Sequence, residues 1–210
     1  WLKHNLESIL KVSNHPEILL LLKILYGRDA FPFQTLNFPN GTRQHFHSDS
    51  LHFNSLPLGF MCGVWVALED INMDSGPLIY YPGSHREKYI NAKDFGLTFT
   101  DINNHQSPQS YFEPYWRDLV DKKNYQKKYF LAKKGDVLIW HANLLHGGST
   151  VRNKCLSRWS MVSHYFFRNC LYTTPIYNTV DSIKHNFYLR KPFDLTKYKF
   201  DENKLIRENK

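Results

Sequence analysis

The sequence has no apolar run long enough to cross a membrane. The longest such run, Ile18 to Leu25, is interrupted by Lys23 and is much shorter than the roughly 20 residues that a spanning helix needs. We also find no signal peptide, no internal repeat and no low-complexity tract. These absences predict a protein without a membrane span and exclude a repeat solenoid. Because the chain begins with Trp1 instead of Met, we expect a trimmed or partial product.

Cysteine is also scarce. The three residues Cys62, Cys155 and Cys170 are an odd number and show no CxxC spacing. This excludes a disulfide scaffold and a zinc ribbon, and it predicts a reducing, cytoplasmic location. Cys62 lies in an apolar run and is expected in the core.

Acidic residues are outnumbered, with 19 Asp and Glu against 27 Lys and Arg and a net charge of +8. The excess is concentrated in residues 121–134, which contain six lysines, and in the tail from Lys184 onward. The simpler interpretation is a solvated lysine-rich face. The alternative is contact with a phosphate, a nucleotide or an acidic glycan.

Short strand-like segments dominate the chain after two expected helices at 2–12 and 16–26. The 210 residues, with 42% hydrophobic and 16% aromatic side chains, predict one compact, mainly β domain of the sandwich or jelly-roll type. Strands are expected at 33–38, 61–70 and 158–167, with a turn, a strand and a turn at 74–85 and a turn followed by a buried strand at 133–141. We divide the chain into a helical part (1–28), a jelly-roll core (31–85 and 129–167), a lid-like polar insertion with a short helix near 111–120 (86–128) and a basic C-terminal tail (168–210).

A group of histidines in GTRQHFHSDSLHF, residues 41–53, indicates a metal site. If this segment is a strand, His47 and Asp49 project from one face, and His45 could form an alternative pair with His47. The third ligand is expected from GDVLIWHANLLHGGST, which offers His141 and His146. We choose His146 because it lies beside Gly147 and Gly148, which we interpret as flexible, and is therefore better placed at the mouth of a jelly roll. Two histidines and one carboxylate leave open positions on a metal ion, as in non-haem Fe(II) oxygenases.

Arg158 and Ser160 are expected to share one face of the strand that follows. A buried guanidinium is costly unless it meets an anion, and its planar fork matches a carboxylate. A short diacid could therefore bind the metal at one end and Arg158 and Ser160 at the other. The alternative is an ordinary surface arginine on an edge strand.

Several motifs in this order resemble the phytanoyl-CoA dioxygenase family over roughly residues 31–167. They are HSD at 47–49, LEDINMDSGPL at 68–78, PGSH at 82–85, GDVLIWHANLLHGG at 135–148 and RWS…HY at 158–165. The resemblance implies a double-stranded β-helix and an Fe(II)- and 2-oxoglutarate-dependent oxygenase that uses O2.

The same resemblance implies a role for individual residues. His47, Asp49 and His146 would bind iron, and Arg158 with Ser160 would bind 2-oxoglutarate. The metal segment is similar to that of the ectoine hydroxylase branch, which places His52 and Phe53 near the substrate. This sequence departs from that branch in having Phe53 instead of tryptophan and Gly148 instead of serine, so the branch's substrate does not carry over.

The predicted function is hydroxylation of a C–H bond in a small, anionic or carrier-linked metabolite. The carboxylate of Asp49 favours hydroxylation over halogenation, and desaturation or cyclisation stays open. The insertion 86–128 would cover the site. One alternative is a cupin-like metal-binding protein or isomerase that does not use 2-oxoglutarate. Another is an oxygenase that acts on nucleic acid, although a nucleic-acid partner is not expected.

Overall fold

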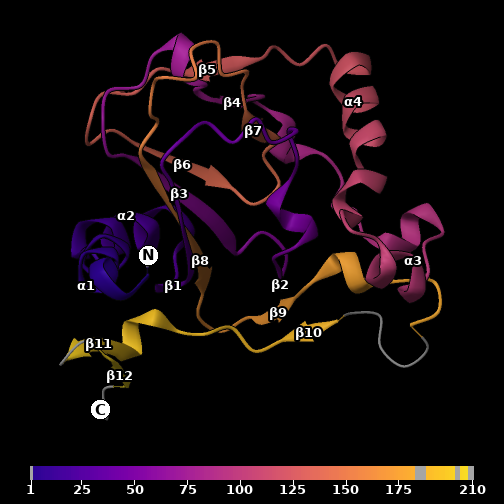
Figure 1. Cartoon of the computed structure of the whole chain (residues 1–210). Coiled ribbons are helices and arrows are strands. Elements are labelled where there is room, and N and C mark those ends of the chain that lie inside the picture. The colour runs from indigo at the N-terminus through magenta and orange to yellow at the C-terminus, as the bar shows by residue number, and fades with distance from the viewer. Residues whose placement is uncertain (1, 183–187, 202–203, 208–210) are drawn as a thin grey trace.

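Two helices open the chain in the computed structural model, which describes residues 2–182, 188–201 and 204–207 (Figure 1). They are α1 (Leu2–Ser13) and α2 (Pro16–Tyr26). Pro16 takes the first turn of α2, where its missing N–H costs nothing, and Gly27 ends the helix with φ of 69°. Both predicted helices are confirmed. None of the described helices is long and apolar enough to cross a membrane.

The major sheet is antiparallel and has the order β1-β8-β3-β6. Its strands are β1 (Ala30–Phe38), β3 (Met61–Ala67), β6 (Val137–His141) and β8 (Ser160–Phe167). Every residue of β8 is buried, since β1 and β3 flank it and both of its faces are covered. The turn and strand expected within 133–141 are present, but the strand was expected to be buried, which is wrong for its first part: Val137 is 43% exposed because β6 is an edge strand.

The helices α1 and α2 cover the outer face of this sheet (Figure 1). Leu22 of α2 packs with Val64 and Phe167, and the hydroxyl of Tyr165 donates to the Ser13 carbonyl at 2.7 Å. Side chains alternate along β8, so the opposite, inner face carries Ser160, Val162, His164 and Phe166. Cys62 is fully buried in the same outer cluster, as predicted.

A second layer of short strands faces the inner side of the major sheet. It contains two three-stranded sheets with the orders β5-β4-β7 and β10-β9-β2. The strands are β2 (Asn54–Leu56), β4 (Leu78–Tyr80), β5 (Lys128–Phe130), β7 (His146–Gly148), β9 (Leu171–Thr173) and β10 (Leu189–Arg190). The sheets are antiparallel throughout. The predicted jelly roll, a double-stranded β-helix, is confirmed.

The insertion 86–128 is more ordered than its polar sequence suggests. It contains α3 (Phe99–Asn104) and α4 (Glu113–Lys122), which lie on the side of the molecule away from α1 and α2 (Figure 1). Short 3-10 turns precede and separate them (Ala92–Phe95 and Pro108–Tyr111). Ile102, Phe112 and Trp116 are buried against Leu145 and Ile176. A shared apolar core therefore fixes the insertion to the jelly roll.

The C-terminal segment also belongs to the folded body. β9 and β10 complete a sheet with β2, and β11 (Tyr198–Asp201) pairs with β12 (Lys204–Arg207). The description of residues 168–210 as a basic tail therefore missed strands that pair with the core. The strands were too short to be recognised, since β10 has only two residues.

Candidate metal centre

Residues 41–53, which we call the site loop, do not form the expected strand. Their regular structure is a single bridge between His47 and His146 and a 3-10 turn at Asp49–Leu51. The Ser48 hydroxyl accepts a hydrogen bond from the Ser50 N–H and caps this turn. Serine side chains compete with strand pairing in this way, so the prediction of a metal strand was wrong in geometry.

His47 and His146 are held side by side by their own backbones. The His47 N–H donates to the His146 carbonyl at 2.9 Å, and the His146 N–H donates to the His47 carbonyl at 3.0 Å. Such a pair places both side chains next to each other, and the ring centroids are 4.7 Å apart. The bridge thus joins the site loop to β7.

Both imidazoles direct the same nitrogen into the centre. Nδ1 of His47 lies 3.0 Å from the His45 carbonyl, and Nδ1 of His146 lies 3.0 Å from the Leu144 carbonyl. A carbonyl accepts only, so each Nδ1 carries a proton, and in the neutral form of each imidazole the lone pair is on Nε2. Metal-bound histidines in proteins are oriented by hydrogen bonds of this kind.

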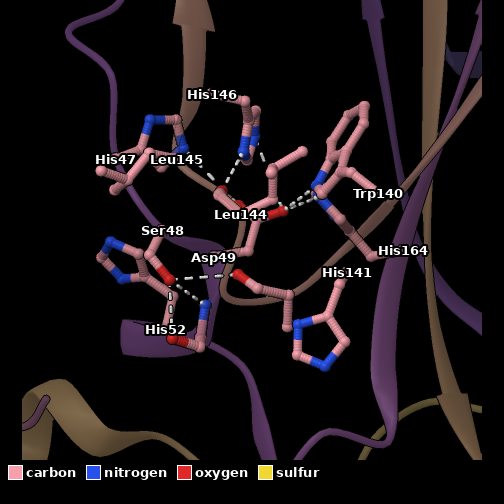
Figure 2. Close-up of polar contacts among 12 residues, drawn as sticks. His47, Ser48, Asp49, His52, Trp140, His141, Leu144, Leu145, His146 and His164 are labelled. Carbon is pink, nitrogen blue, oxygen red and sulfur yellow. Dashed lines mark hydrogen bonds and ion pairs between the residues drawn. The ribbon is translucent and has the colours of Figure 1, made fainter. Parts of the chain in front are cut away.

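Asp49 lies between the two imidazoles and the major sheet (Figure 2). Its Oδ1 is 3.5 Å from Nε2 of His47, and its Oδ2 is 3.7 Å from Nε2 of His146. One ligand atom from each of the three residues lies within 4.8 Å of the others. Ligands about 2.1 Å from an ion and at right angles lie about 3 Å apart, so small side-chain shifts would close this group around a metal.

Asp49 and His146 have the charge states that a divalent metal needs, for different reasons. All three are at most 6% exposed. Burial alone raises the pKa of Asp49, but the imidazoles of His146 and His164 outweigh it and hold that pKa well below its usual value. Burial lowers the pKa of His146 to about 4, although Asp49 acts in the opposite direction. At neutral pH, Asp49 is ionised and His146 is neutral.

Two side chains of the major sheet, to which we assigned no role from the sequence, complete the surroundings of Asp49. The Trp140 indole donates from Nε1 to Oδ2 at 2.8 Å, and Nε2 of His164 lies 3.4 Å from the same oxygen (Figure 2). They occupy Oδ2 and leave Oδ1 facing His47. His164 lies four residues after Ser160 in β8 and therefore on the same face of the strand, so the alternation of side chains in a strand could have indicated His164 as a site residue. No local signal indicates the partner of Trp140.

Asn143 ties the site loop to the turn between β6 and β7. Its Oδ1 accepts hydrogen bonds from Ser48 Oγ at 3.0 Å and from Ser50 Oγ at 2.7 Å. Its Nδ2 donates to the Glu87 carbonyl at 2.7 Å. This buried network joins three separate parts of the chain, namely the site loop, the turn after β6 and the segment at Glu87, so it specifies one arrangement of the loop.

Gly147 and Gly148 are required by close packing, whereas we had interpreted them as flexible. A Cβ on Gly147 would lie 2.8 Å from the Gln44 carbonyl oxygen and 2.8 Å from Cα of Phe46. A Cβ on Gly148 would lie 2.6 Å from Oγ1 of Thr42. The site loop therefore passes directly over β7, which explains the glycine at 148.

Arg158 opens onto a narrow cavity of about 70 Å³ that His146 and His164 also line. The side chain is 2% exposed, and its Nε has no hydrogen-bond partner among the described residues. Within the described part of the chain, the guanidinium makes one hydrogen bond, from NH2 to the Asn40 carbonyl, which is long at 3.4 Å. Burial lowers the pKa of Arg158 to about 10, so it remains a cation. Ser160 is fully buried on the same face, and its Oγ is also without a described partner.

The remaining candidate residues lie outside the group. His141 points away from it (Figure 2), and its Nδ1 accepts from the Asn143 N–H. His45 is held by the Phe46 carbonyl through its Nδ1. His52 and Phe53 line a different cavity next to the centre, where Nε2 of His52 lies 3.1 Å from Oε1 of Gln109.

Comparison with known proteins agrees with this arrangement. The model of the phytanoyl-CoA dioxygenase (PhyH) family matches residues 10–159, which is more than half of the chain. The chain belongs to the phytanoyl-CoA dioxygenase family. Phytanoyl-CoA dioxygenase domain-containing protein 1 from Danio rerio is 32% identical over 103 residues, 48% of this chain and 31% of the relative. The peroxisomal phytanoyl-CoA dioxygenase of Bos taurus is 25% identical over 183 residues, 79% of this chain and 48% of the relative. This family member thus spans about half the length of the bovine protein.

Solved structures show the same fold. EctD from S. alaskensis, solved with 2-oxoglutarate and 5-hydroxyectoine, has a TM-score of 0.62 at 17% identity, covering 91% of this chain and 62% of EctD. The epimerase SnoN, solved with Fe3+, alpha ketoglutarate and nogalamycin RO, has a TM-score of 0.57 at 18% identity. The match covers 87% of this chain and 73% of SnoN. At these identities the likeness concerns the fold.

Proposed function

We propose that this protein is an Fe(II)- and 2-oxoglutarate-dependent dioxygenase that hydroxylates a C–H bond of a small molecule. One observation supports this most directly: the buried, unpaired cation of Arg158 faces the same small cavity as His146. A metal-binding protein that does not use 2-oxoglutarate has no need for a cation there. The family and the fold agree with the proposal.

His47, Asp49 and His146 would hold the iron. Their donor set of two imidazole nitrogens and one carboxylate is the facial arrangement of non-haem Fe(II) oxygenases. Each Nδ1 donates to a backbone carbonyl, so Nε2 of each imidazole and Oδ1 of Asp49 are the atoms that would bind the metal. Trp140 and His164 would keep the carboxylate in place.

Arg158 would bind the distal carboxylate of 2-oxoglutarate, with Ser160 as a second donor. The guanidinium lies about 6 Å from the ring centroids of both Phe38 and Trp65 (6.0 and 5.9 Å), so the aromatic walls limit its motion. A carboxylate would satisfy Nε and neutralise a charge that burial destabilises.

When bound, iron and 2-oxoglutarate supply oxidative decarboxylation coupled to activation of O2. The chain supplies orientation and exclusion of water. Trp116 of α4 is 2% exposed, and its ring lies 6.4 Å from that of His47. We propose that the insertion 86–128 covers the centre and that substrate enters beside His52 and Phe53.

The proposal is tested by anaerobic reconstitution of the protein with Fe(II), followed by titration with 2-oxoglutarate. We expect a visible metal-to-ligand charge-transfer band in the wild type. The Arg158→Ala variant should need at least tenfold more 2-oxoglutarate for half of that band, because one partner of a buried charge pair is removed. Arg152→Ala, an exposed arginine that pairs with Asp74, is the control. Absence of a band despite bound iron would reject the oxygenase assignment.

Product analysis then identifies which type of reaction the protein catalyses. Proteins of this fold include the carbocyclase SnoK and the epimerase SnoN, so mass spectrometry of a turned-over substrate must show a gain of one oxygen atom. Loss of two hydrogens, or a product of unchanged mass, would reject hydroxylation and leave the metal and 2-oxoglutarate sites intact.

A further inference from the structure

A cavity of about 610 Å³ lies next to the candidate metal centre. Phe53 connects the two, because it lines this cavity and its ring centroid is 5.4 Å from that of His164. His164 in turn lies 3.4 Å from Asp49. The size is within the range of small-molecule sites, about 300–1,000 Å³.

Arg190 extends into this cavity from β10. Its guanidinium carbon lies 4.8 Å from the ring centroid of Phe53, 5.4 Å from Phe33 and 6.0 Å from Phe166. Its NH1 makes a long hydrogen bond of 3.4 Å to the His52 carbonyl. Three aromatic rings therefore orient the cation while most of its donors stay available.

The charge of Arg190 is not balanced by any described residue. Arg168 and Arg152 each have a carboxylate within 4 Å (Asp194 and Asp74), but Arg190 has none in the described part of the chain. The described lining residues of the cavity include no Asp or Glu. Burial lowers the pKa of Arg190. Arg190 therefore supplies an uncompensated positive charge at this position, which an anion would stabilise.

The other residues that line the cavity indicate the chemical nature of the rest of the ligand. Phe53, Ile102 and Ile176 offer apolar surface, and Thr174, Tyr177 and Gln109 offer hydrogen-bonding groups. We propose that Arg190 binds a carboxylate or phosphate group of the substrate, with an apolar portion of the substrate against Phe53. This inference rests on the proposed function for the identity of the ligand as substrate. Arg190 would then determine which carbon reaches the metal.

The test uses isothermal titration calorimetry with octanoate, octyl phosphate and neutral octanol as probes. The protein is held anaerobically with Fe(II) and saturating 2-oxoglutarate, so that Arg158 is occupied. We expect the anions to bind more tightly than octanol, and Arg190→Gln to raise their dissociation constants at least tenfold. The tighter of the two anions distinguishes a carboxylate from a phosphate substrate.

Arg28→Gln is the matched control. Arg28 is also half-buried, stacks on Phe60 at 4.0 Å and donates to a backbone carbonyl. Its removal should change the anion affinities less than twofold. Gln106→Glu is a second test that leaves the packing of Arg190 intact: Gln106 is exposed on the cavity wall, and the added negative charge should weaken anion binding. This variant decides the question if Arg190→Gln does not fold.

Equal anion affinities in the wild type, Arg190→Gln and Gln106→Glu would overturn the inference, as would octanol binding as tightly as the anions. The charge-transfer band, recorded on the same samples, separates this inference from the proposed function. A normal band without Arg190-dependent binding rejects the inference alone. Arg190-dependent binding without a band rejects the oxygenase assignment and keeps the anion site.

Discussion

The candidate metal centre has two sides that hold their residues in different ways. The ligand side consists of the site loop and β7, which carry His47, Asp49 and His146. The sheet side is the inner face of β6 and β8, with Trp140 and His164. β8 is paired along its length with β1 and β3, whereas the site loop pairs with β7 as a β-bridge at His47 and His146 and by one further backbone hydrogen bond, from Gly148 N–H to the Gln44 carbonyl.

This difference follows from what each side must do. Same-face neighbours on an extended strand are about 7 Å apart, but His47 and Asp49 must converge on one ion. The 3-10 turn at Asp49 brings its carboxylate to 3.5 Å from His47. The ligand side is therefore irregular, and the regular sheet side restrains it. Substitutions on the two sides should therefore change the Fe(II) affinity by different amounts.

The largest effect is expected on the ligand side, from Asp49→Asn. The amide removes the negative charge and one ligand oxygen, so anaerobic equilibrium dialysis should show at least a hundredfold loss of Fe(II) affinity. Asp74→Asn, an exposed carboxylate that pairs with Arg152, should leave the affinity unchanged. Retained affinity in Asp49→Asn would remove this residue from the ligand set.

Gly147→Ala tests whether the contact between the site loop and β7 positions the ligands. The new methyl group would meet backbone atoms at 2.8 Å, so we expect a loss of roughly 1–3 kcal/mol in unfolding free energy together with weaker Fe(II) binding. Gly96→Ala is the comparison, because its Cβ would meet no atom within 4 Å but its φ is +70°. That variant should lose about 1 kcal/mol and bind Fe(II) normally. Equal Fe(II) affinities in the two variants would contradict the explanation.

Trp140→Phe tests the sheet side. It removes the indole donor to Oδ2 of Asp49 but keeps most of the apolar volume, so Fe(II) affinity should fall about tenfold. Trp159→Phe, at a partly exposed position, should have no effect. If Trp140→Phe were as damaging as Asp49→Asn, the distinction between the two sides would be lost.

The smallest expected effect is the pH dependence of the stability of the metal-free protein. Burial lowers the pKa of His146 from 6.5 to about 4, so the unfolded state binds a proton at a higher pH than the folded state. The stability associated with His146 is therefore complete above about pH 6.5 and declines as the pH falls toward about 4. Thermal unfolding in chelator should show this decline, and His146→Gln should reduce it. A midpoint independent of pH in this range would contradict the assignment.

Elements with strong local signals could be predicted from the order of amino acids alone. Pro16 and Gly27 delimit α2, and the continuous apolar run near Val64 predicts a buried strand. The HxD pattern with His146, and Arg158 ahead of a strand, also pointed to residues that the structure brings around one centre. These signals depend on the chemistry of nearby residues, which the order of amino acids displays directly.

The contacts between groups that are distant in the sequence could not be predicted and are known from the folded structure. Trp140 reaches Asp49, Asn143 joins Ser48 to Glu87, and Arg190 lies over Phe53. Each of these contacts depends on strand order and on the path of a loop between elements. Such contacts form because the packed layers leave one arrangement in which buried polar groups are satisfied and apolar faces are covered. That condition applies to the whole chain at once and has no local pattern.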